Sequence, residues 1–217
     1  MPLLPEILSK LLYAYNTRRW RRRLQRIKFM GEEFILLPEV FDPRGVISTE
    51  LLAKVLPLQG EILEVGCGSG VLTCLAARTA SRVLAFDVNP IAAKNALMNT
   101  RLHNLQGKVD VLTADASSLE VKQLFDVALV NPPYLPLQPR NLVEAAWCAG
   151  EKLELLESML RFSYHHLKSG GRIYVVLSSL AGRRAEELLA ELFHSIEVKE
   201  RRATPFDVIM LFQGVKP

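Results

Sequence analysis

The glycine-rich segment Gly66–Gly70 constrains the fold most, because a candidate strand precedes it and a candidate helix follows it directly. Residues Glu61–Val65 are typical of a short strand, and Val71–Arg78 looks helical. A strand, glycines and a helix in this order let the backbone approach a nucleotide-like ligand at the helix N-terminus. The order therefore predicts an α/β sheet with a ligand site where its strands end. A purely structural glycine turn is the alternative interpretation.

The spacing of the glycines favours S-adenosylmethionine over a dinucleotide as that ligand. A dinucleotide fingerprint reads G-x-G-x-x-G, whereas here the third glycine comes early, at Gly70, and Val71 follows it. Glu64 precedes the first glycine by two positions, where its carboxylate can meet a cationic amino group. This pattern fits the methionine end of S-adenosylmethionine better than a pyrophosphate. The next candidate strand, Val83–Asp87, ends in a carboxylate suited to ribose hydroxyls, although dinucleotide folds carry a similar acid.

The tetrapeptide Asn131–Tyr134 follows the apolar run Val127–Val130 and predicts a stiff loop at the end of a buried strand. Two prolines fix φ and carry no N–H, so the loop can aim carbonyl acceptors at a ligand. The Asn131 side chain supplies a further acceptor oxygen, and Tyr134 can stack on a planar group. Such a pocket suits an exocyclic base amine or a carboxamide. An ordinary Pro-Pro turn is the alternative.

The rest of the chain alternates strands and helices, as a doubly wound sheet requires. At 217 residues the chain can build one sizeable core. Further helices are expected at 49–55, where Ser48 or Thr49 can cap the start, and at 90–103, 153–167 and 183–193. Further strands are expected at 34–37, 109–113, 172–178, 196–201 and 206–213. The last two strands leave no room for a helix between them, so they should pair antiparallel.

Positive charge is concentrated at the start of the chain. Residues 1–30 carry a net charge of +7, while the whole chain carries +4. Apolar residues recur there at helical spacing in two runs: Leu4, Ile7, Leu8, Leu11 and Tyr15, then Trp20, Leu24 and Ile27. We therefore expect a basic amphipathic helical extension over residues 1–30 and a main domain over residues 31–217. The basic stretch Arg18–Lys28 suits contact with RNA or the ribosome, and less well a membrane surface. The alternative is a helix packed on the main domain.

Composition excludes several other classes. No apolar stretch is long enough to span a bilayer, and the first residues lack the pattern of a secretion signal. Three cysteines without a C-x-x-C pair, and four histidines without ligand spacing, argue against a metal site. We therefore expect a reduced, cytoplasmic protein.

Taken together, these features resemble a class I S-adenosylmethionine-dependent methyltransferase, a family with a Rossmann-like, doubly wound, seven-stranded and mostly parallel sheet whose last strand is antiparallel. Over about residues 40–213 the chain is similar to the HemK-like protein-glutamine N5-methyltransferases, which modify the Gly-Gly-Gln loop of peptide release factors. Glu144–Trp147 and Phe41–Pro43 are similar to the short eukaryotic and archaeal branch of that family. Ser48 stands where the branch usually has an acidic residue.

The resemblance implies roles for individual residues. The cofactor site would contain Thr49, Glu64, Gly66, Gly68, Gly70, Asp87, Asp115, Ala116 and Asn131. Asp115 would take the adenine amine, with the Ala116 amide nearby. The substrate would contact Asn131, Pro132, Pro133 and Tyr134, and among these Asn131, Pro132 and Tyr134 would be catalytic. Asn131 and the Pro132 carbonyl would accept the two protons of the substrate's –NH2 group.

Three functions stay open at this point. The first is methylation of a release-factor glutamine. The second is methylation of an adenine-N6 or guanine-N2 amine in RNA or DNA, because the tetrapeptide also occurs in those enzymes. The third is a non-catalytic scaffold, against which the intact Glu64, Asp87 and Asn131 argue. The resembled branch also pairs with a small zinc-binding activator subunit, which implies a partner at the strand Val109–Thr113.

Overall fold

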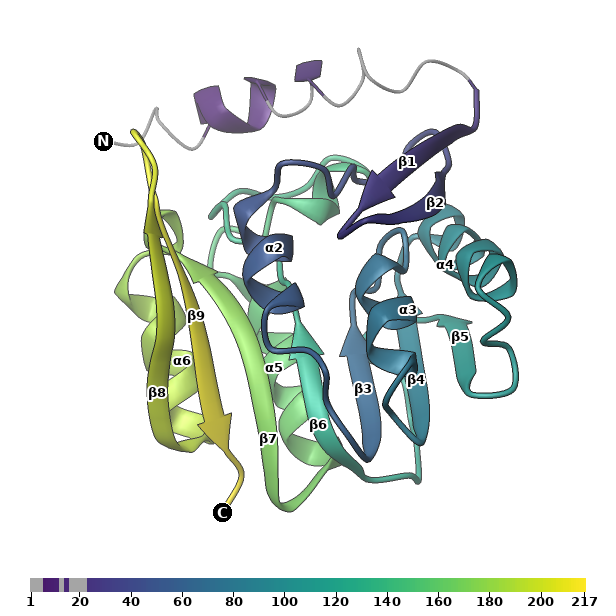
Figure 1. Cartoon of the computed structure of the whole chain (residues 1–217). Helices are drawn as coiled ribbons and strands as arrows, with labels where there is room; N and C mark the ends of the chain where they lie inside the picture. Colours follow the sequence, from purple (N-terminus) through teal and green to yellow (C-terminus); the bar gives the residue numbers. More distant parts are fainter. Residues whose placement is uncertain (1–5, 12–13, 16–22) are drawn as a thin grey trace.

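The computed structural model describes residues 6–11, 14–15 and 23–217, and a seven-stranded sheet forms its centre (Figure 1). The strands run in the order β5-β4-β3-β6-β7-β9-β8. Strands β3 to β7 pair in parallel, as the doubly wound fold requires. Their bounds are β3 (Glu61–Val65), β4 (Arg82–Asp87), β5 (Val109–Thr113), β6 (Phe125–Val130) and β7 (Leu167–Ser178).

Helices cover both faces of the sheet. Figure 1 shows α2 (Ile47–Ala53), α3 (Val71–Ala77) and α4 (Pro90–Leu102) on the near face, with α5 (Glu154–His166) and α6 (Arg183–Leu192) behind it. Each face has its own apolar core, and neighbouring residues of β3 contribute to opposite cores, Ile62 to one and Leu63 to the other. This alternation, with helices on two sides, confirms the doubly wound α/β fold.

The two closing strands, β8 (His194–Ala203) and β9 (Val208–Val215), pair antiparallel, as their short connection predicts. Strand β9 lies between β7 and β8 and runs antiparallel to both. Strand β7 begins five residues earlier than expected, so Gly170 and Gly171 belong to it. The reason is pairing with the end of the chain: the Gly170 N–H donates to Lys216 O, and the Lys216 N–H donates to Gly171 O (both 2.9 Å).

A separate two-stranded hairpin precedes the sheet, and its first strand corrects the sequence analysis. Residues 6–11 and 14–15 are helical as expected, but β1 (Gln25–Phe29) is a strand that pairs antiparallel with β2 (Glu32–Leu36). Ile27 and Phe29 are buried while Arg26 and Lys28 are exposed, which is the two-residue period of a strand. The expected second helical run is therefore wrong at β1; Trp20 and the basic residues at 18, 19, 21 and 22 lie outside the described residues.

Two details complete the fold. Helix α4 begins as expected, with Pro90 in its first turn and the Asn89 side chain accepting from the Ile91 N–H (2.9 Å). Helix α2 differs, because Val46 is its N-cap and the expected caps, Ser48 and Thr49, are buried inside it. In the part of the chain that the structure describes, no helix is both long and apolar enough to cross a membrane.

Candidate functional site

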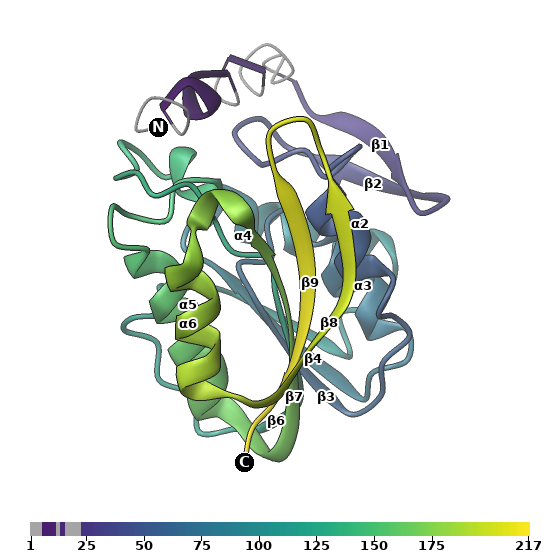
Figure 2. The ribbon, with the colours of Figure 1, turned by 90° about the vertical axis from the view of Figure 1, so that its left-hand side faces the viewer.

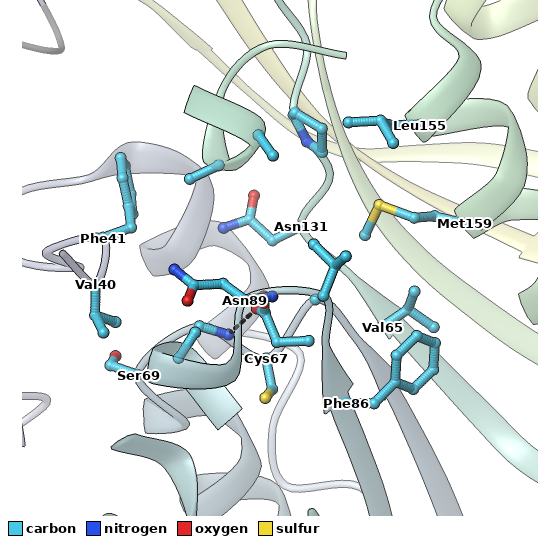
Figure 3. Close-up of a pocket in the computed structure, with 18 of the residues that line it drawn as sticks. Val40, Phe41, Val65, Cys67, Ser69, Phe86, Asn89, Asn131, Leu155 and Met159 are labelled. Carbon is cyan, nitrogen blue, oxygen red and sulfur yellow. Dashed lines mark hydrogen bonds between the residues drawn. The ribbon is translucent and has the colours of Figure 1, made fainter. Parts of the chain in front are cut away.

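A cavity opens at the carboxyl ends of β3, β4 and β6 (Figure 3). It is lined by the glycine loop, the end of β4, the loop after β6, and residues of α2 and α5. The structure brings together most of the residues that the sequence singled out: Thr49, Glu64, Gly66, Gly68, Asp87, Asp115, Ala116, Asn131, Pro133 and Tyr134. Gly70 and Pro132 are buried but do not line the cavity.

The glycine loop is held in place by backbone bonds. The Gly66 and Cys67 N–H groups donate to the Phe86 carbonyl (2.9 and 3.0 Å), and Gly70 N–H donates to Cys67 O (2.8 Å). Gly70 has a φ of 78° and caps α3, and a Cβ there would meet Ala96 of α4 at 2.7 Å. Gly70 therefore allows α3 and α4 to pack closely against each other, and this packing is its role in the described structure.

The Asp87 carboxylate organises the end of β4. One oxygen accepts from the Gly68 N–H (2.8 Å) and the other accepts from the Asn89 N–H (2.9 Å). Burial raises the pKa of Asp87, and these two bonds oppose the rise. Each carboxylate oxygen can accept a second bond. Asp87 thus has spare acceptor capacity at the cavity, which suits vicinal hydroxyls such as those of a ribose.

Glu64 is a buried acid, only 4% exposed, and its carboxylate accepts a hydrogen bond from the Thr73 hydroxyl. Burial raises the pKa of Glu64 to about 8; the Thr73 bond opposes this rise and the charge of Asp87 adds to it. Among the described residues that line the cavity, the charged side chains are all acidic: Glu39, Glu64, Asp87 and Asp115. Acids without a basic neighbour fit a cationic ligand, and S-adenosylmethionine carries both a sulfonium and an amino group.

Asn131 projects into the cavity from the end of β6 (Figure 3). Its Nδ2 donates to the hydroxyl of Thr49 on α2 (3.3 Å). This bond occupies one amide proton and orients the side chain, so that the carbonyl oxygen stays available as an acceptor. Thr49, expected at the cofactor, therefore contacts Asn131 in the described structure.

Tyr134 and its neighbours are fixed by a second loop. The N–H groups of Tyr134 and Leu135 donate to the carbonyl of Trp147, which follows the short 3₁₀ helix η1 (Glu144–Ala146) (3.3 and 2.8 Å). Burial, followed by the charge of Asp207, raises the pKa of Tyr134 to about 12, so its ring stays neutral. The Trp147 indole N–H donates to Ser9 Oγ (3.2 Å), which ties the N-terminal helical segment to this loop. Figure 2 shows the backbone of this segment at the top of the molecule.

Asp115 and Ala116 lie beyond β5. Asp115 Oδ1 accepts from the Ser117 N–H (2.8 Å), which closes a local turn at the edge of the cavity. The other Asp115 carboxylate oxygen retains acceptor capacity for an amine.

Sequence reasoning missed three asparagines, the N-cap Asn89 of α4 and Asn95 and Asn99 within the helix. All three are buried. A signal was present for Asn95 and Asn99, because asparagine is disfavoured inside helices, and the two residues are four apart and share one helix face. It also missed Met159 and Leu155, which form the α5 wall of the cavity.

The chain is similar to known proteins over most of its length. Residues 32–209 match the model of the family described as the methyltransferase small domain. A protein of Methanocaldococcus jannaschii, provisionally named a protein N5-glutamine methyltransferase, is 30% identical over 197 residues, which cover 87% of this chain and 98% of that protein. Ribosomal RNA small subunit methyltransferase C of Erwinia tasmaniensis is 29% identical over 167 residues, which cover 75% of this chain and 44% of that protein.

A solved structure with the same fold is that of a T. thermophilus 16S rRNA guanine-N2 methyltransferase in complex with AdoMet and guanosine. It superimposes with a TM-score of 0.67 at 21% identity, over 90% of this chain and 50% of that one. The chain thus spans about half the length of these two ribosomal RNA methyltransferases.

Proposed function

Because the chain belongs to the methyltransferase small domain family and is an S-adenosylmethionine-dependent methyltransferase, we propose that its acceptor is the side-chain amide of a glutamine in a peptide release factor. The observation that carries this proposal is the M. jannaschii relative, which is named for glutamine methylation and is matched over 98% of its length. The Erwinia and T. thermophilus ribosomal RNA methyltransferases are matched over about half of theirs.

The charge of the cavity supports a protein acceptor. A nucleotide brings a phosphate close to its base, and proteins neutralise phosphates with lysine and arginine. Besides the three acids assigned to the cofactor, the described residues that line the cavity include one further acid, Glu39, and no lysine, arginine or histidine that could neutralise a phosphate. A glutamine amide is uncharged and needs no such neutralising group.

The chain's own residues would hold the two reactants. Glu64 and Asp87 would take the amino group and the ribose hydroxyls of the cofactor, and Asp115 with the Ala116 N–H would take its adenine. When bound, S-adenosylmethionine supplies a methyl group on a sulfonium, which is already an excellent leaving group. The protein therefore mainly aligns the reactants, and positioning of this kind can contribute about 7–11 kcal/mol.

Asn131 would act on the acceptor nitrogen. An amide nitrogen is a poor nucleophile because its lone pair is delocalised. The Asn131 carbonyl oxygen, oriented by Thr49, would accept one amide proton. We assign the second proton to the carbonyl of Pro132, whose neighbours Asn131 and Pro133 both line the cavity, and the stacking contact to Tyr134. These bonds strengthen as positive charge develops on nitrogen, so they favour the transition state over the ground state.

The test is transfer of labelled methyl to purified substrates. The chain should methylate a class 1 release factor and fail with the same factor whose Gly-Gly-Gln glutamine is replaced by alanine. Purified ribosomal RNA and transfer RNA, offered in parallel, should stay unlabelled. Labelled RNA together with an unlabelled release factor would contradict the proposal.

A second candidate is methylation of a guanine-N2 or adenine-N6 amine in RNA. The observation that favours it is the 29% identity to the Erwinia ribosomal RNA methyltransferase. The stretch Arg18–Lys28 would contact RNA phosphates; its described members, Arg23, Arg26 and Lys28, are exposed. RNA labelling that falls as salt rises would support this candidate.

We further propose that a small zinc-binding subunit adds a strand to β5. In the described sheet β5 lies at one edge, and Leu112 on it is 40% exposed. An exposed edge with apolar side chains is an aggregation hazard unless it is covered, and strand addition covers it. The ion pair between Asp110 and Arg82 (2.6 Å) could instead protect the edge. A chain that is monodisperse and fully active alone would contradict the need for this partner.

A further inference from the structure

The buried asparagines of α4 connect parts of the chain that are distant in sequence. Asn95 and Asn99 are both fully buried, one turn apart, and they face the backbone of β2. Asn95 Oδ1 accepts from the Leu37 N–H (2.8 Å), and its Nδ2 donates to Ile35 O (2.8 Å). At the outer edge of β2, where a further strand would otherwise pair, the backbone groups therefore bond to side chains of a helix.

Asn99 differs from Asn95 in one contact. Its Oδ1 accepts from the Ile35 N–H (2.7 Å), and its Nδ2 donates to Ile35 O (2.8 Å), as in the Asn95 arrangement. The second Nδ2 proton goes to the main-chain carbonyl of Ser69 in the glycine loop (2.8 Å). One amide group therefore joins the hairpin to the loop.

Both ends of this bridge reach the cavity. Ser69 lines it directly, and the chain that leaves β2 lines it at Glu39, Val40 and Phe41 (Figure 3). Asn89 Nδ2 donates to Glu39 O (3.4 Å), so α4 holds this wall at its first turn as well. The cavity wall on the hairpin side is therefore set by α4.

We propose that Asn99 is a positioning residue for S-adenosylmethionine. Through its contacts with Ile35 and Ser69, Asn99 couples the position of the β1–β2 hairpin to the conformation of the glycine loop. Without its donor, the Ser69 carbonyl is buried and unpaired, and the turn Cys67–Gly70 loses its outer support. The loop then presents its backbone groups to the cofactor less often in the binding conformation. The apparent affinity for S-adenosylmethionine therefore falls in proportion to the fraction of molecules that hold the binding conformation.

Asn95 provides a matched control, because it makes the same kind of contact to the hairpin and none to the loop. Asn99→Ala and Asn95→Ala should both lower the midpoint of denaturant unfolding. Calorimetry with S-adenosylmethionine should show about tenfold weaker binding for Asn99→Ala and less than about a twofold change for Asn95→Ala. Equal losses in the two variants, or unchanged binding in Asn99→Ala, would overturn the proposal.

A measurement on the unsubstituted protein keeps the test decisive if Asn99→Ala does not fold. Coupling is reciprocal, so the cofactor should stabilise the hairpin. Saturation with S-adenosylmethionine should slow hydrogen exchange at the Ile35 and Leu37 amides by about tenfold, because these N–H groups bond to Asn99 and Asn95. Slowing confined to the glycine loop, with both amides unchanged, would show that the bridge carries no coupling.

Discussion

At the scale of single residues, Glu64 makes cofactor binding depend on pH. Its carboxyl has a pKa of about 8 without ligand, and a cationic amino group would favour the deprotonated form. Binding should therefore release a proton, and affinity should rise between about pH 6 and pH 7.5, by up to about tenfold per pH unit. Calorimetry in buffers of different ionisation enthalpy measures that proton. Glu64→Gln should bind more weakly and without this slope.

The same group should affect stability with the opposite trend. The pKa of Glu64 is higher in the folded protein than the ordinary value of 4.5. The folded state then holds its proton more tightly, so the free energy of unfolding falls as pH rises from about 4.5 to 8. Denaturant unfolding over this range should show a shallower fall for Glu64→Gln. An identical profile for both proteins would mean that Glu64 is ionised in the free enzyme.

Asn131 should separate binding from chemistry. Asn131→Ala should retain much of its cofactor affinity but lose roughly 100- to 1000-fold in turnover, because the lost acceptor acts on the substrate nitrogen. Thr49→Val, which removes the hydroxyl that orients Asn131, should show a smaller loss in the same direction. Single-turnover methyl transfer measures both. Near-normal turnover by Asn131→Ala would rule out the proposed role.

The residues most accessible to sequence reasoning were those beside a strand end. Glu64, Asp87 and Asn131 reach one cavity because parallel strands end at the same edge of a sheet. Asn99 was not accessible in this way, because its function depends on partners at Ile35 and Ser69 that only the folded chain brings together. Gly70 and Pro132 belong to the right motifs but do not line the cavity, and for Gly70 the reason is its close packing against Ala96 of α4.

At the scale of elements, Gly70 sets the distance between α3 and α4. Gly70→Ala should destabilise the protein by about 1–3 kcal/mol, because a Cβ would lie 2.7 Å from Ala96 and the φ of 78° is strained for alanine. Gly45→Ala is the control, since Gly45 also has a positive φ but no atom near its added Cβ. Denaturant midpoints give the difference. Equal losses would assign the whole effect to backbone strain.

The hairpin shows why element type was missed at β1. Ile27 satisfies two patterns, the helical spacing from Trp20 and Leu24 and the alternation with Phe29. Five residues are too few for periodicity alone to separate these patterns. Tertiary contacts decide between helix and strand, because β2 pairs with β1 and Asn99 of α4 accepts a hydrogen bond from the Ile35 N–H of β2. The long alternation from β3 onward had no such ambiguity, and the type and order of its elements were predicted, although β7 begins earlier than expected.

At the scale of the whole molecule, β9 connects the edge strand β8 to β7 and so to the rest of the sheet. Its buried Leu211 and Phe212 belong to opposite cores, and β8 has no other strand partner in the described sheet. Removal of residues 208–217 should therefore abolish cooperative unfolding, as followed by circular dichroism. Removal of Pro217 alone should leave the transition intact. A cooperative transition in the shorter protein would show that β3 to β7 fold independently.

The position of β9 also bears on how the protein is made. Translation delivers strands in chain order, but the neighbour that β7 requires is synthesised after β8. Until then, the nascent chain presents an unpaired β7 edge that contains Val175, Val176 and Leu177, which are fully buried once folding is complete. Exposed edges of this kind recruit other chains. A chain that ends between residues 203 and 208 would therefore carry an incomplete sheet whose exposed edge binds other chains, and its folding would depend on chaperones.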